Sequence, residues 1–367
     1  MKRVRLLLSV VILLGVLGGG FAWWLERELH TPVAHPRSDQ YVDIPRGFST
    51  AEVTERLAAI GVIRRAWPLL LYIRLNRLGP RLKAGQYRFP SPISPLGVLR
   101  KLEEGEQRLS RFTIIEGWTR WDIASAMAHI PELKLSSADE ALALMDDTSS
   151  IRDLDPQAKN LEGYLYPDTY NFAPNTSARE VVATLVRRFR QVWINDFAER
   201  ARESNISLHE ALTVASLVES EAKLKEERPL IASVIYNRLR RGMPLGIDST
   251  VIYAAKVAGK WKNDGRIYQS DLDRDSPYNT RKVRGLPPGP VGSPSARSLE
   301  AALSPAETDY LYYVRNPARD DGAHNFYHEP AEFERGVQAL REWERQQRER
   351  EAAPDSTIPE SSPEAGK

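Results

Sequence analysis

The sequence contains 367 residues, which is long enough for two or more domains with a substantial hydrophobic core. Its 51 basic and 49 acidic residues are well mixed, and the net charge of +2 indicates no nucleic-acid partner. The absence of cysteine excludes disulfide frameworks, cysteine-ligated zinc and thiol catalysis.

The N-terminus consists of a basic stretch, residues 1–5, followed by an uncharged run over residues 6–25. A helix of that length spans about 30 Å, the thickness of a bilayer core, and Trp23 and Trp24 close the run as an interfacial pair would. By the positive-inside rule we expect a cytoplasmic stretch at 1–5, a single-pass anchor at 6–25 in the lipid of the cell inner membrane, and a periplasmic or extracytoplasmic catalytic domain. A cleaved signal peptide is the alternative, and the length of the run favours the anchor.

A polar stretch with two prolines, residues 26–39, is typical of a linker. An internal repeat follows, in which the pattern of residues 44–58 returns at residues 114–128. Each copy predicts a strand, a glycine turn, a Ser or Thr N-cap with an acidic residue three positions later, and a helix. The pattern indicates a compact α+β module over residues 40–130, either a structural spacer or a ligand-binding unit.

Residues 131–157 are acidic and helical in pattern and predict a connector. From residue 158 to residue 345 the sequence changes to longer helices and to loops rich in aromatic residues, proline and glycine. We expect helices at residues 178–202, 208–223, 227–241 and 298–303, and a charged helix from Phe333 to Arg350. The final stretch, residues 346–367, is rich in proline, serine and glutamate and is expected to be disordered.

Glu219 is the strongest candidate for chemistry. Residues 207–222 begin with a capping-box pattern at Ser207 and Glu210 and place Glu219 inside the apolar arc of a helix. Burial there would raise the pKa of the carboxyl group, as a general acid near neutral pH requires. A glutamate that reaches water or pairs with an arginine is the alternative, and Glu221 lies at the opposite edge of the same arc. The helix alone does not choose between the two acids.

Aromatic, acidic, proline and glycine residues gather in loops at residues 161–170, 276–280, 285–290 and 322–328. Rigid aromatic faces beside hydrogen-bonding groups suit sugar rings, so these loops predict a groove for a polar, ring-containing polymer. His324 and His328 make only a weak metal pair, and the sequence contains no Walker loop, dinucleotide fingerprint or Gly-x-Ser-x-Gly elbow. We therefore expect neither a metal nor a cofactor, and acid–base chemistry by a carboxylate.

Three polar residues follow the Glu219 helix in the sequence. Asn237 and Arg238 end an apolar helical face, so they either reach into a groove or tie down a loop. Asp248 stands before a Ser-Thr pair and predicts a helix N-cap.

Six motifs, in order and spacing, resemble those of the endolytic murein transglycosylase family, also called YceG-like or MltG. They extend over roughly residues 40–340 and are Glu-Gly-Tyr-Leu-Tyr-Pro-Asp-Thr-Tyr at 162–170, Ala-Ser-Leu-Val-Glu-Ser-Glu at 215–221, Val-Ile-Tyr-Asn-Arg-Leu at 234–239, Asp-Ser-Thr-Val-Ile-Tyr at 248–253, Ser-Pro-Tyr-Asn-Thr at 276–280 and Gly-Leu-Pro-Pro-Gly-Pro-Val at 285–291. The resemblance implies a LysM-like module at 40–130 and a mainly helical, lysozyme-like catalytic domain with loop and short-strand insertions at 158–345. Arg281 and Phe333 replace an aromatic residue and a histidine that the family usually has near these positions.

The resemblance implies a lytic transglycosylase that cleaves between N-acetylmuramic acid and N-acetylglucosamine within peptidoglycan glycan strands and leaves 1,6-anhydro ends. It carries catalysis onto Glu219 and implies termination of nascent strands and association with membrane peptidoglycan synthases. The residues expected to help Glu219 or to bind substrate are Glu221, Glu162, Tyr166, Asp168, Asn237, Arg238, Asp248, Tyr278 and Asn279. A lysozyme-like hydrolase with the same acid and a non-catalytic peptidoglycan-binding scaffold are the alternatives.

Overall fold

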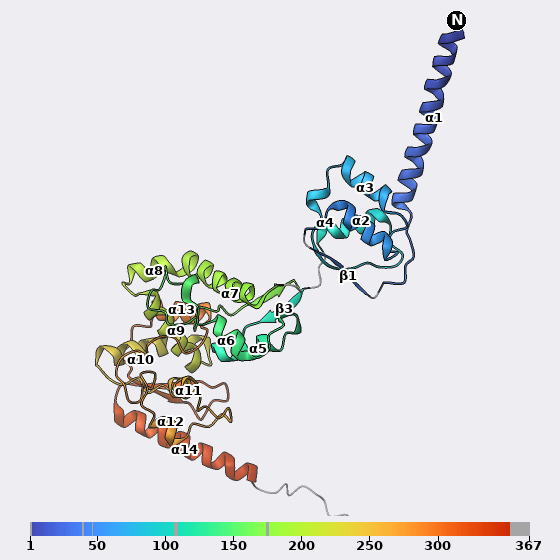
Figure 1. Ribbon diagram of the computed structural model, residues 1–367. Coiled ribbons are helices and arrows are strands. Elements are labelled where there is room, and N and C mark those ends of the chain that lie inside the picture. Colours follow the sequence, from blue (N-terminus) through green and yellow to red (C-terminus); the bar gives the residue numbers. More distant parts are fainter. Residues whose placement is uncertain (1, 39, 46, 106–108, 174–175, 353–367) are drawn as a thin grey trace, which may run out of the picture. The chain divides into compact units, whose positions relative to one another are not determined.

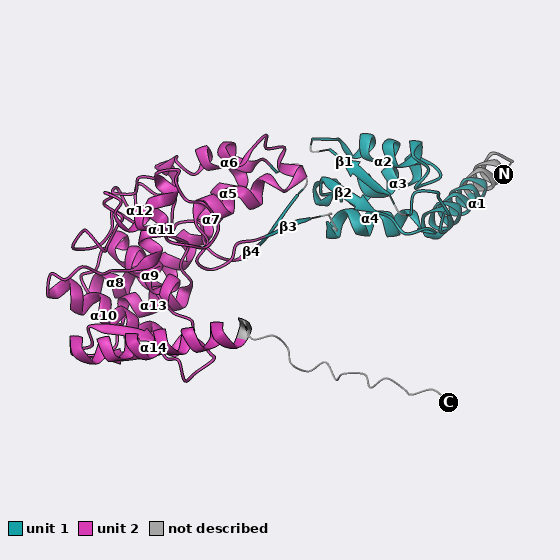
Figure 2. Cartoon of the chain, turned by 90° about the horizontal axis from the view of Figure 1, so that it is seen from below, with its two compact units in different colours: residues 1–112, 170–176 teal, residues 113–169, 177–367 magenta. Residues whose placement is uncertain are grey.

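The computed structural model describes residues 2–38, 40–45, 47–105, 109–173 and 176–352 (Figure 1). The chain forms two compact units (Figure 2). Unit 1 comprises residues 1–112 and 170–176, and unit 2 comprises residues 113–169 and 177–367. Helices predominate and short two-stranded sheets accompany them, which confirms the predicted α+β class.

Unit 1 is a small module around one hydrophobic core. Its main elements are α1 (Lys2–His30), β1 (Tyr41–Ile44), α2 (Thr50–Ala59), α3 (Ala66–Leu75), a 3-10 turn (Gly79–Arg81), β2 (Gly85–Arg88) and α4 (Pro95–Glu104). β1 and β2 pair antiparallel with Tyr41 opposite Arg88, and alternate side chains of β1 are buried. Leu57, Tyr87 and Leu102 are among the fully enclosed side chains of this core.

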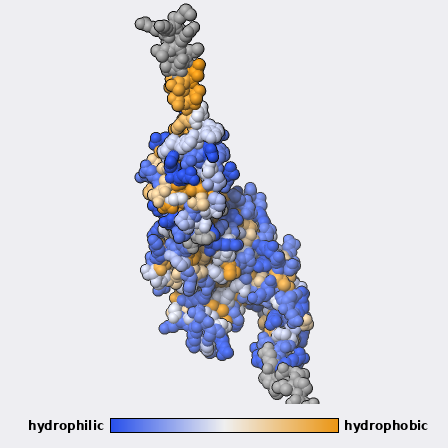
Figure 3. All heavy atoms as spheres, turned by 90° about the vertical axis from the view of Figure 1, so that its right-hand side faces the viewer, coloured by the Kyte–Doolittle hydropathy of each residue, from blue (hydrophilic) through white to orange (hydrophobic). Residues whose placement is uncertain are grey.

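Helix α1 exposes a row of large apolar side chains within residues 12–21 (Figure 3). Its last turns carry charged residues at 26–28 and pack onto unit 1, where Leu29 is buried in the core. Within the part of the chain that the structure describes, no helix combines the length and the apolar character needed to cross a membrane. This finding overturns the predicted single-pass anchor at residues 6–25, its contact with membrane lipid, and the inner-membrane location inferred from it.

Unit 2 is mainly helical and holds the candidate site. Its elements are α5 (Arg120–Ala128), a 3-10 turn (Pro131–Leu133), α6 (Ala138–Leu144), a 3-10 turn (Thr148–Ser150), α7 (Ala178–Val192), a π-helical turn (Trp193–Phe197), α8 (Ala198–Glu203), α9 (Leu208–Glu221), a 3-10 turn (Lys225–Glu227), α10 (Arg228–Arg240), α11 (Asp248–Val257), α12 (Gln269–Leu272), α13 (Ala296–Leu303), β5 (Tyr312–Arg315), β6 (His324–Tyr327) and α14 (Pro330–Ala352). β3 (Ser110–Thr113) pairs with β4 (Thr169–Phe172), and the boundary between the units runs through both strands, most of which belong to unit 1. β5 and β6 form an antiparallel hairpin.

The two copies of the sequence repeat have the predicted local structure. The N-cap N–H of Ser49 donates to Glu52 at 2.7 Å, and the N-cap N–H of Thr119 donates to Asp122 at 2.9 Å. A strand, a glycine turn and a capped helix are therefore confirmed in each copy. The copies nevertheless belong to different units, because the boundary falls inside the stretch 40–130 that the sequence assigns to one module.

Several predicted elements differ from the structure in extent. The helix predicted at 178–202 is interrupted by the π-helical turn, and α14 continues beyond Arg350 into the predicted tail, residues 346–367. The end of that tail, from residue 353, lies outside the described residues. The acidic connector predicted at 131–157 contains α6 and two 3-10 turns, and α1 continues to His30 into the predicted linker.

Helix α9 is the central helix of unit 2, where α10, α11 and α13 pack against it. Every residue within 211–218 is buried, including Thr213 and Ser216, which the sequence pattern places on a polar face. Thr213 donates its hydroxyl to the His209 carbonyl at 2.7 Å, and Ser216 accepts the Val291 N–H at 3.0 Å. The periodicity thus predicts the helix but not its complete enclosure.

Candidate active site

Glu219 and Glu221 both lie in the last turn of α9, which Ser207 caps at the other end by accepting the Glu210 N–H at 3.1 Å. Carboxylates at a helix C-terminus face the negative end of the helix dipole, so each anion needs compensation from another part of the chain. Since successive helical residues turn by about 100°, the two side chains point in different directions. Their surroundings decide which of them can carry a proton.

Glu219 is held as an anion in a closed environment, with its side chain only 6% exposed. Ser295 donates its N–H (2.9 Å) and its hydroxyl (2.5 Å) to Oε2, Ser298 donates its hydroxyl to the same oxygen (2.7 Å), and Arg228 donates to Oε1 (3.0 Å). Burial alone would raise the pKa of Glu219, but these bonds outweigh it and lower the pKa below its ordinary value. The raised pKa predicted from the helical pattern is therefore wrong, and the alternative of an arginine-paired glutamate is confirmed.

The bonds of Glu219 join three helices. Arg228 is the first residue of α10, and Ser295 is the N-cap of α13, so Glu219 connects the end of α9 to the beginnings of both neighbours. The positive ends of those two helix dipoles add to the stabilisation of the anion. A glycine turn lies next to the stem of this side chain, since a Cβ on Gly117 would be 3.9 Å from Glu219 Cγ. We call Glu219 an internal tie, that is, a buried side chain whose hydrogen bonds link the ends of three helices.

Glu221 has fewer partners. The Tyr313 hydroxyl donates to Oε2 at 2.9 Å, and no other residue that the structure describes donates a hydrogen bond to this carboxylate. Burial raises the pKa of Glu221. The bond from Tyr313 lowers it, the Asp248 carboxylate raises it further, and His324 and Arg281 lower it without cancelling the effect of burial. Of the two acids on α9, Glu221 is therefore the one that holds its proton more readily.

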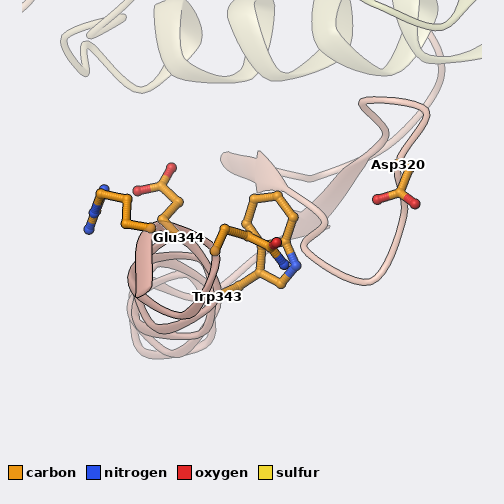
Figure 4. A pocket seen from close by; sticks show the side chains of 5 residues that line it. Asp320, Trp343 and Glu344 are labelled. Atoms are coloured by element: carbon orange, nitrogen blue, oxygen red, sulfur yellow. The ribbon is translucent and has the colours of Figure 1, made fainter. Parts of the chain in front are cut away.

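Glu221 also lines a pocket of about 380 Å³, within the size range of ligand-binding sites. The other lining residues are Lys223, Arg315, Asp320, Asp321, Gly322 and His324. The β5–β6 hairpin forms one wall of the pocket, to which it contributes Arg315 and His324. These two residues pair in register, and Tyr313 lies on the same face of the hairpin as Arg315. A neighbouring cavity of about 620 Å³ shares Asp320 and is lined on α14 by Trp343 and Glu344 (Figure 4).

His324 is oriented within the Glu221 pocket by Glu227. Its backbone N–H donates to Glu227 Oε1 at 2.7 Å, and its Nδ1 lies 2.7 Å from Oε2. Because a carboxylate accepts the bond, Nδ1 carries the proton and Nε2 is the nitrogen left for a ligand. His328 lies 2.7 Å from Asp309 instead, so the weak metal pair considered from the sequence does not converge on one point.

Glu162 is a second buried acid, at 2% exposure. The Arg120 backbone N–H lies 3.1 and 3.2 Å from its two carboxylate oxygens, and the Tyr253 hydroxyl is a further hydrogen-bond partner. Burial outweighs these contacts and raises the pKa of Glu162 to about 7. The adjacent cavity, beside Tyr278, measures only about 10 Å³ and is too small for a sugar.

The aromatic loops line two different cavities. The loop at 322–328 reaches the Glu221 pocket, whereas the loops at 161–170 and 276–290 meet at the small cavity beside Glu162. The loops at 276–290 contact both α9 and α11, because His209 bonds to the Pro288 carbonyl oxygen and Thr250 bonds to Thr280. The loop at 322–328 lies next to the candidate acid, and a groove shared by all of these loops stays a prediction.

His209 fixes one of the supporting loops to α9. Its Nδ1 lies 2.7 Å from Asp155, and its Nε2 lies 3.0 Å from the Pro288 carbonyl oxygen. Since both partners are acceptors, both ring nitrogens carry protons. The bond to Asp155 raises the pKa of His209 accordingly.

Asn237 and Arg238 tie down a loop and do not enter the Glu221 pocket. Asn237 Nδ2 donates to the carbonyl oxygens of Thr308 and Tyr310 at 2.9 and 2.8 Å. Arg238 Nε donates to the Leu311 carbonyl oxygen at 2.6 Å. Of the two readings left open by the sequence, the structure shows the loop tie.

Four further candidates also have internal partners. Asn279 donates to two carbonyl oxygens of its own loop, each at 2.9 Å, and Tyr278 packs against the ring of Tyr253. Asp168 accepts from Arg188 at 3.0 Å, and the same guanidinium lies 5.6 Å from the centre of the Tyr166 ring. None of these four side chains lines the Glu221 pocket.

Comparison with known proteins agrees with the motif pattern. The YceG-like family matches residues 42–339. The chain belongs to the YceG-like family. An endolytic murein transglycosylase of Bacillus subtilis is 34% identical over 316 residues, covering 82% of this chain and 84% of the relative. One of Streptococcus pneumoniae is 30% identical over 333 residues, covering 84% of this chain and 60% of the relative. A crystal structure of a yceG-like protein from Listeria monocytogenes has a TM-score of 0.55 and 34% identity, covering 80% of this chain and 98% of that one.

The two departures from the YceG-like pattern have local partners. Arg281 donates to Asp248 at 2.5 and 3.0 Å, and the Phe333 ring stacks on Tyr312 at 5.0 Å. Asp248 is the first residue of α11, and Ile247 occupies the N-cap position, so the predicted N-cap is wrong. Both members of this pair act on Glu221: the Asp248 carboxylate raises the pKa of Glu221, and the Arg281 guanidinium lowers it.

Glu162→Gln is expected to remove a pH dependence of stability from this YceG-like chain. The pKa of Glu162 is about 7 in the folded state against an ordinary value of 4.5, so only the unfolded state loses the proton between these values. Its stabilising contribution is complete below pH 4.5, falls as the pH rises to about 7, and then stays constant. At about 1.4 kcal/mol per unit the loss is roughly 3 kcal/mol.

Urea unfolding at pH 5 and pH 8 measures this effect. Relative to the wild type, the variant should gain stability at pH 8 that it does not show at pH 5. Other titrating groups cancel in the comparison because they are common to both proteins. An equal difference between the two proteins at both pH values would contradict the assignment.

Proposed function

We propose that this protein is an endolytic murein transglycosylase that cleaves the glycan strands of peptidoglycan, with Glu221 as its acid and base. It is an enzyme of the lytic transglycosylase class, as its family membership and its relatives' names support. The observation that carries the assignment to Glu221 is its position: a carboxyl group with a raised pKa on the wall of a pocket of about 380 Å³.

The first half of the reaction uses the neutral form of Glu221. Its proton passes to the oxygen of the bond between N-acetylmuramic acid and N-acetylglucosamine, and the bond from that oxygen to C1 of muramic acid breaks as an oxocarbenium-like state develops. Tyr313 occupies Oε2 by its hydrogen bond, which leaves Oε1 to carry the proton. His324 Nε2 is placed to hold a substrate hydroxyl or amide group.

The second half uses the carboxylate that remains. Glu221 takes the proton of the muramic C6 hydroxyl while that oxygen bonds to C1, which closes the 1,6-anhydro ring and restores the neutral acid. The substrate provides the nucleophile, so the step requires no second carboxylate. One carboxyl group alternates between acid and base, and a pKa raised by burial suits both steps.

This assignment departs from the sequence expectation, which places catalysis on Glu219. A general acid must start protonated, and the hydrogen bonds from Ser295, Ser298 and Arg228 favour the anion of Glu219. Glu219 supports the site by fixing the end of α9, from which Glu221 projects.

Unit 1 is the natural place for a LysM-like function that holds the glycan near the enzyme. Its β1–α2 segment has the form of the sequence repeat, on which the resemblance to a LysM-like module depends. Peptidoglycan synthases are the protein partners that the resemblance implies, and termination of nascent strands is the matching biological role. Sedimentation of unit 1 variants with purified sacculi would test the contact with peptidoglycan.

Digestion of purified peptidoglycan by the full chain tests the reaction. We expect soluble fragments whose muramic ends are one water lighter than reducing ends, as a 1,6-anhydro product requires. Products with reducing ends would replace the proposal by a lysozyme-like hydrolase. Binding to sacculi without any soluble fragment would replace it by a non-catalytic scaffold.

A further inference from the structure

A pocket of about 470 Å³ lies on unit 2 apart from the Glu221 pocket, with which it shares no lining residue. Two tryptophans, Trp121 of α5 and Trp261 of the loop after α11, are half-buried in its walls. The packing of Trp121 fixes its ring, because the ring meets Tyr253 edge-on at 5.3 Å and lies 4.8 Å from the Arg120 guanidinium. The pocket therefore has a preformed aromatic wall.

The polar groups of this pocket form a balanced set. Lys256 and Asp122 pair at 3.2 Å, so their charges offset each other, and Ser125 and Asn263 add neutral donors and acceptors. Lys256 also donates to the Thr119 hydroxyl at 3.1 Å, which holds the pair in place. Aromatic faces beside neutral hydrogen-bonding groups suit a ligand with apolar faces and uncharged hydroxyl or amide groups, as N-acetylated sugars have.

Helix α11 connects the two pockets. At its first turn, Ser249 shares a hydrogen bond of 2.7 Å with Ser220, the residue between Glu219 and Glu221. At its last turn, Lys256 lines the tryptophan pocket. Ser249 and Lys256 are seven residues apart, which is about 10 Å along a helix. A strand bound at Glu221 therefore has to extend beyond the sugars at the cleaved bond to reach the second pocket.

We propose that the pocket between Trp121 and Trp261 is a distal subsite for N-acetylated sugars of the glycan strand. The inference rests on the proposed function and specifies how a strand is selected: the enzyme binds a sugar that lies outside the pocket in which it cleaves the bond. Long strands occupy both pockets and short ones only the first. The subsite therefore selects the interior of long strands and lowers the KM for them.

Trp261→Ala in the full chain tests the subsite, with Trp23→Ala as the matched control because Trp23 is exposed on α1 and lines neither pocket. Calorimetric titration with the hexasaccharide of N-acetylglucosamine, in a Glu221→Gln background that blocks turnover, should show a Kd raised roughly tenfold by Trp261→Ala. Trp261→Phe should retain most of the affinity, and Trp23→Ala should leave the Kd unchanged. With active enzyme, Trp261→Ala should raise KM for long peptide-free strands and leave kcat unchanged.

The outcomes separate this inference from the proposed function. Cleavage of peptidoglycan by a Trp261→Ala enzyme with unchanged Kd and KM overturns the subsite and leaves the transglycosylase intact. Absence of cleavage by the wild type, together with saccharide binding that depends on Trp261, overturns the reaction and retains the subsite. An equal loss of affinity in Trp23→Ala, or no saccharide binding by the wild type, also overturns the subsite.

Discussion

Glu221→Gln is expected to lower the rate of glycan cleavage by about 10²–10⁴-fold, the usual contribution of a general acid or base. Glutamine keeps the shape of the side chain and can still accept the Tyr313 hydroxyl, so the pocket should stay intact. It carries no acidic proton, and both halves of the proposed reaction stop. The loss should appear in kcat, because the amide still contacts the substrate but contributes nothing in the transition state.

The pH profile identifies the acid more sharply than the loss of rate. In the wild type the rate should fall as the pH rises through the raised pKa of Glu221, since the neutral form starts the reaction. Tyr313→Phe removes a hydrogen bond that stabilises the anion, so it should raise this pKa and move the falling limb to higher pH. Wild-type activity in Glu221→Gln, or an unmoved limb in Tyr313→Phe, would remove Glu221 from the mechanism.

Local signals in the sequence predicted much of the fold of unit 2. Ser207 caps α9 as expected, and apolar periodicity identified α9 and α10 to within a few residues. The capping box at Thr119 marks a helix that the structure contains. These features depend on residues a few positions apart, so a single sequence reveals them.

The environment of the two glutamates could not be predicted in this way. Ser295, which donates hydrogen bonds to Glu219, is 76 positions away from it. Tyr313, which donates a hydrogen bond to Glu221, is 92 positions away. Two residues separated by one position on α9 thus obtain opposite pKa shifts from distant segments. The sequence indicated an acid on this helix, and only the tertiary contacts distinguish the internal tie from the pocket acid. Glu227 and His324 were missed as a pair for the same reason, since they are 97 positions apart.

Glu219→Gln is expected to lower the stability of the protein by about 3–5 kcal/mol, the usual cost of removing one partner from a buried ion pair. Both side chains of the pair are enclosed, with Arg228 at 9% and Glu219 at 6% exposure. Glutamine retains part of the hydrogen bonding but leaves the Arg228 charge without a counter-ion. The three helix ends joined at this point lose their common partner.

Urea unfolding of the full chain measures the loss, and activity per folded molecule distinguishes a tie from a catalyst. If Glu219 is a tie, the folded fraction of Glu219→Gln should cleave glycan with the pH profile of the wild type. The double variant Glu219→Gln, Arg228→Met should recover part of the stability, because it removes the unpaired charge as well. A stable Glu219→Gln protein without activity would instead restore the expectation, implied by the family resemblance, that Glu219 is the catalytic acid. In that case the hydrogen bonds from Ser295 and Ser298 would have to break on substrate binding, so that the carboxylate could take up a proton.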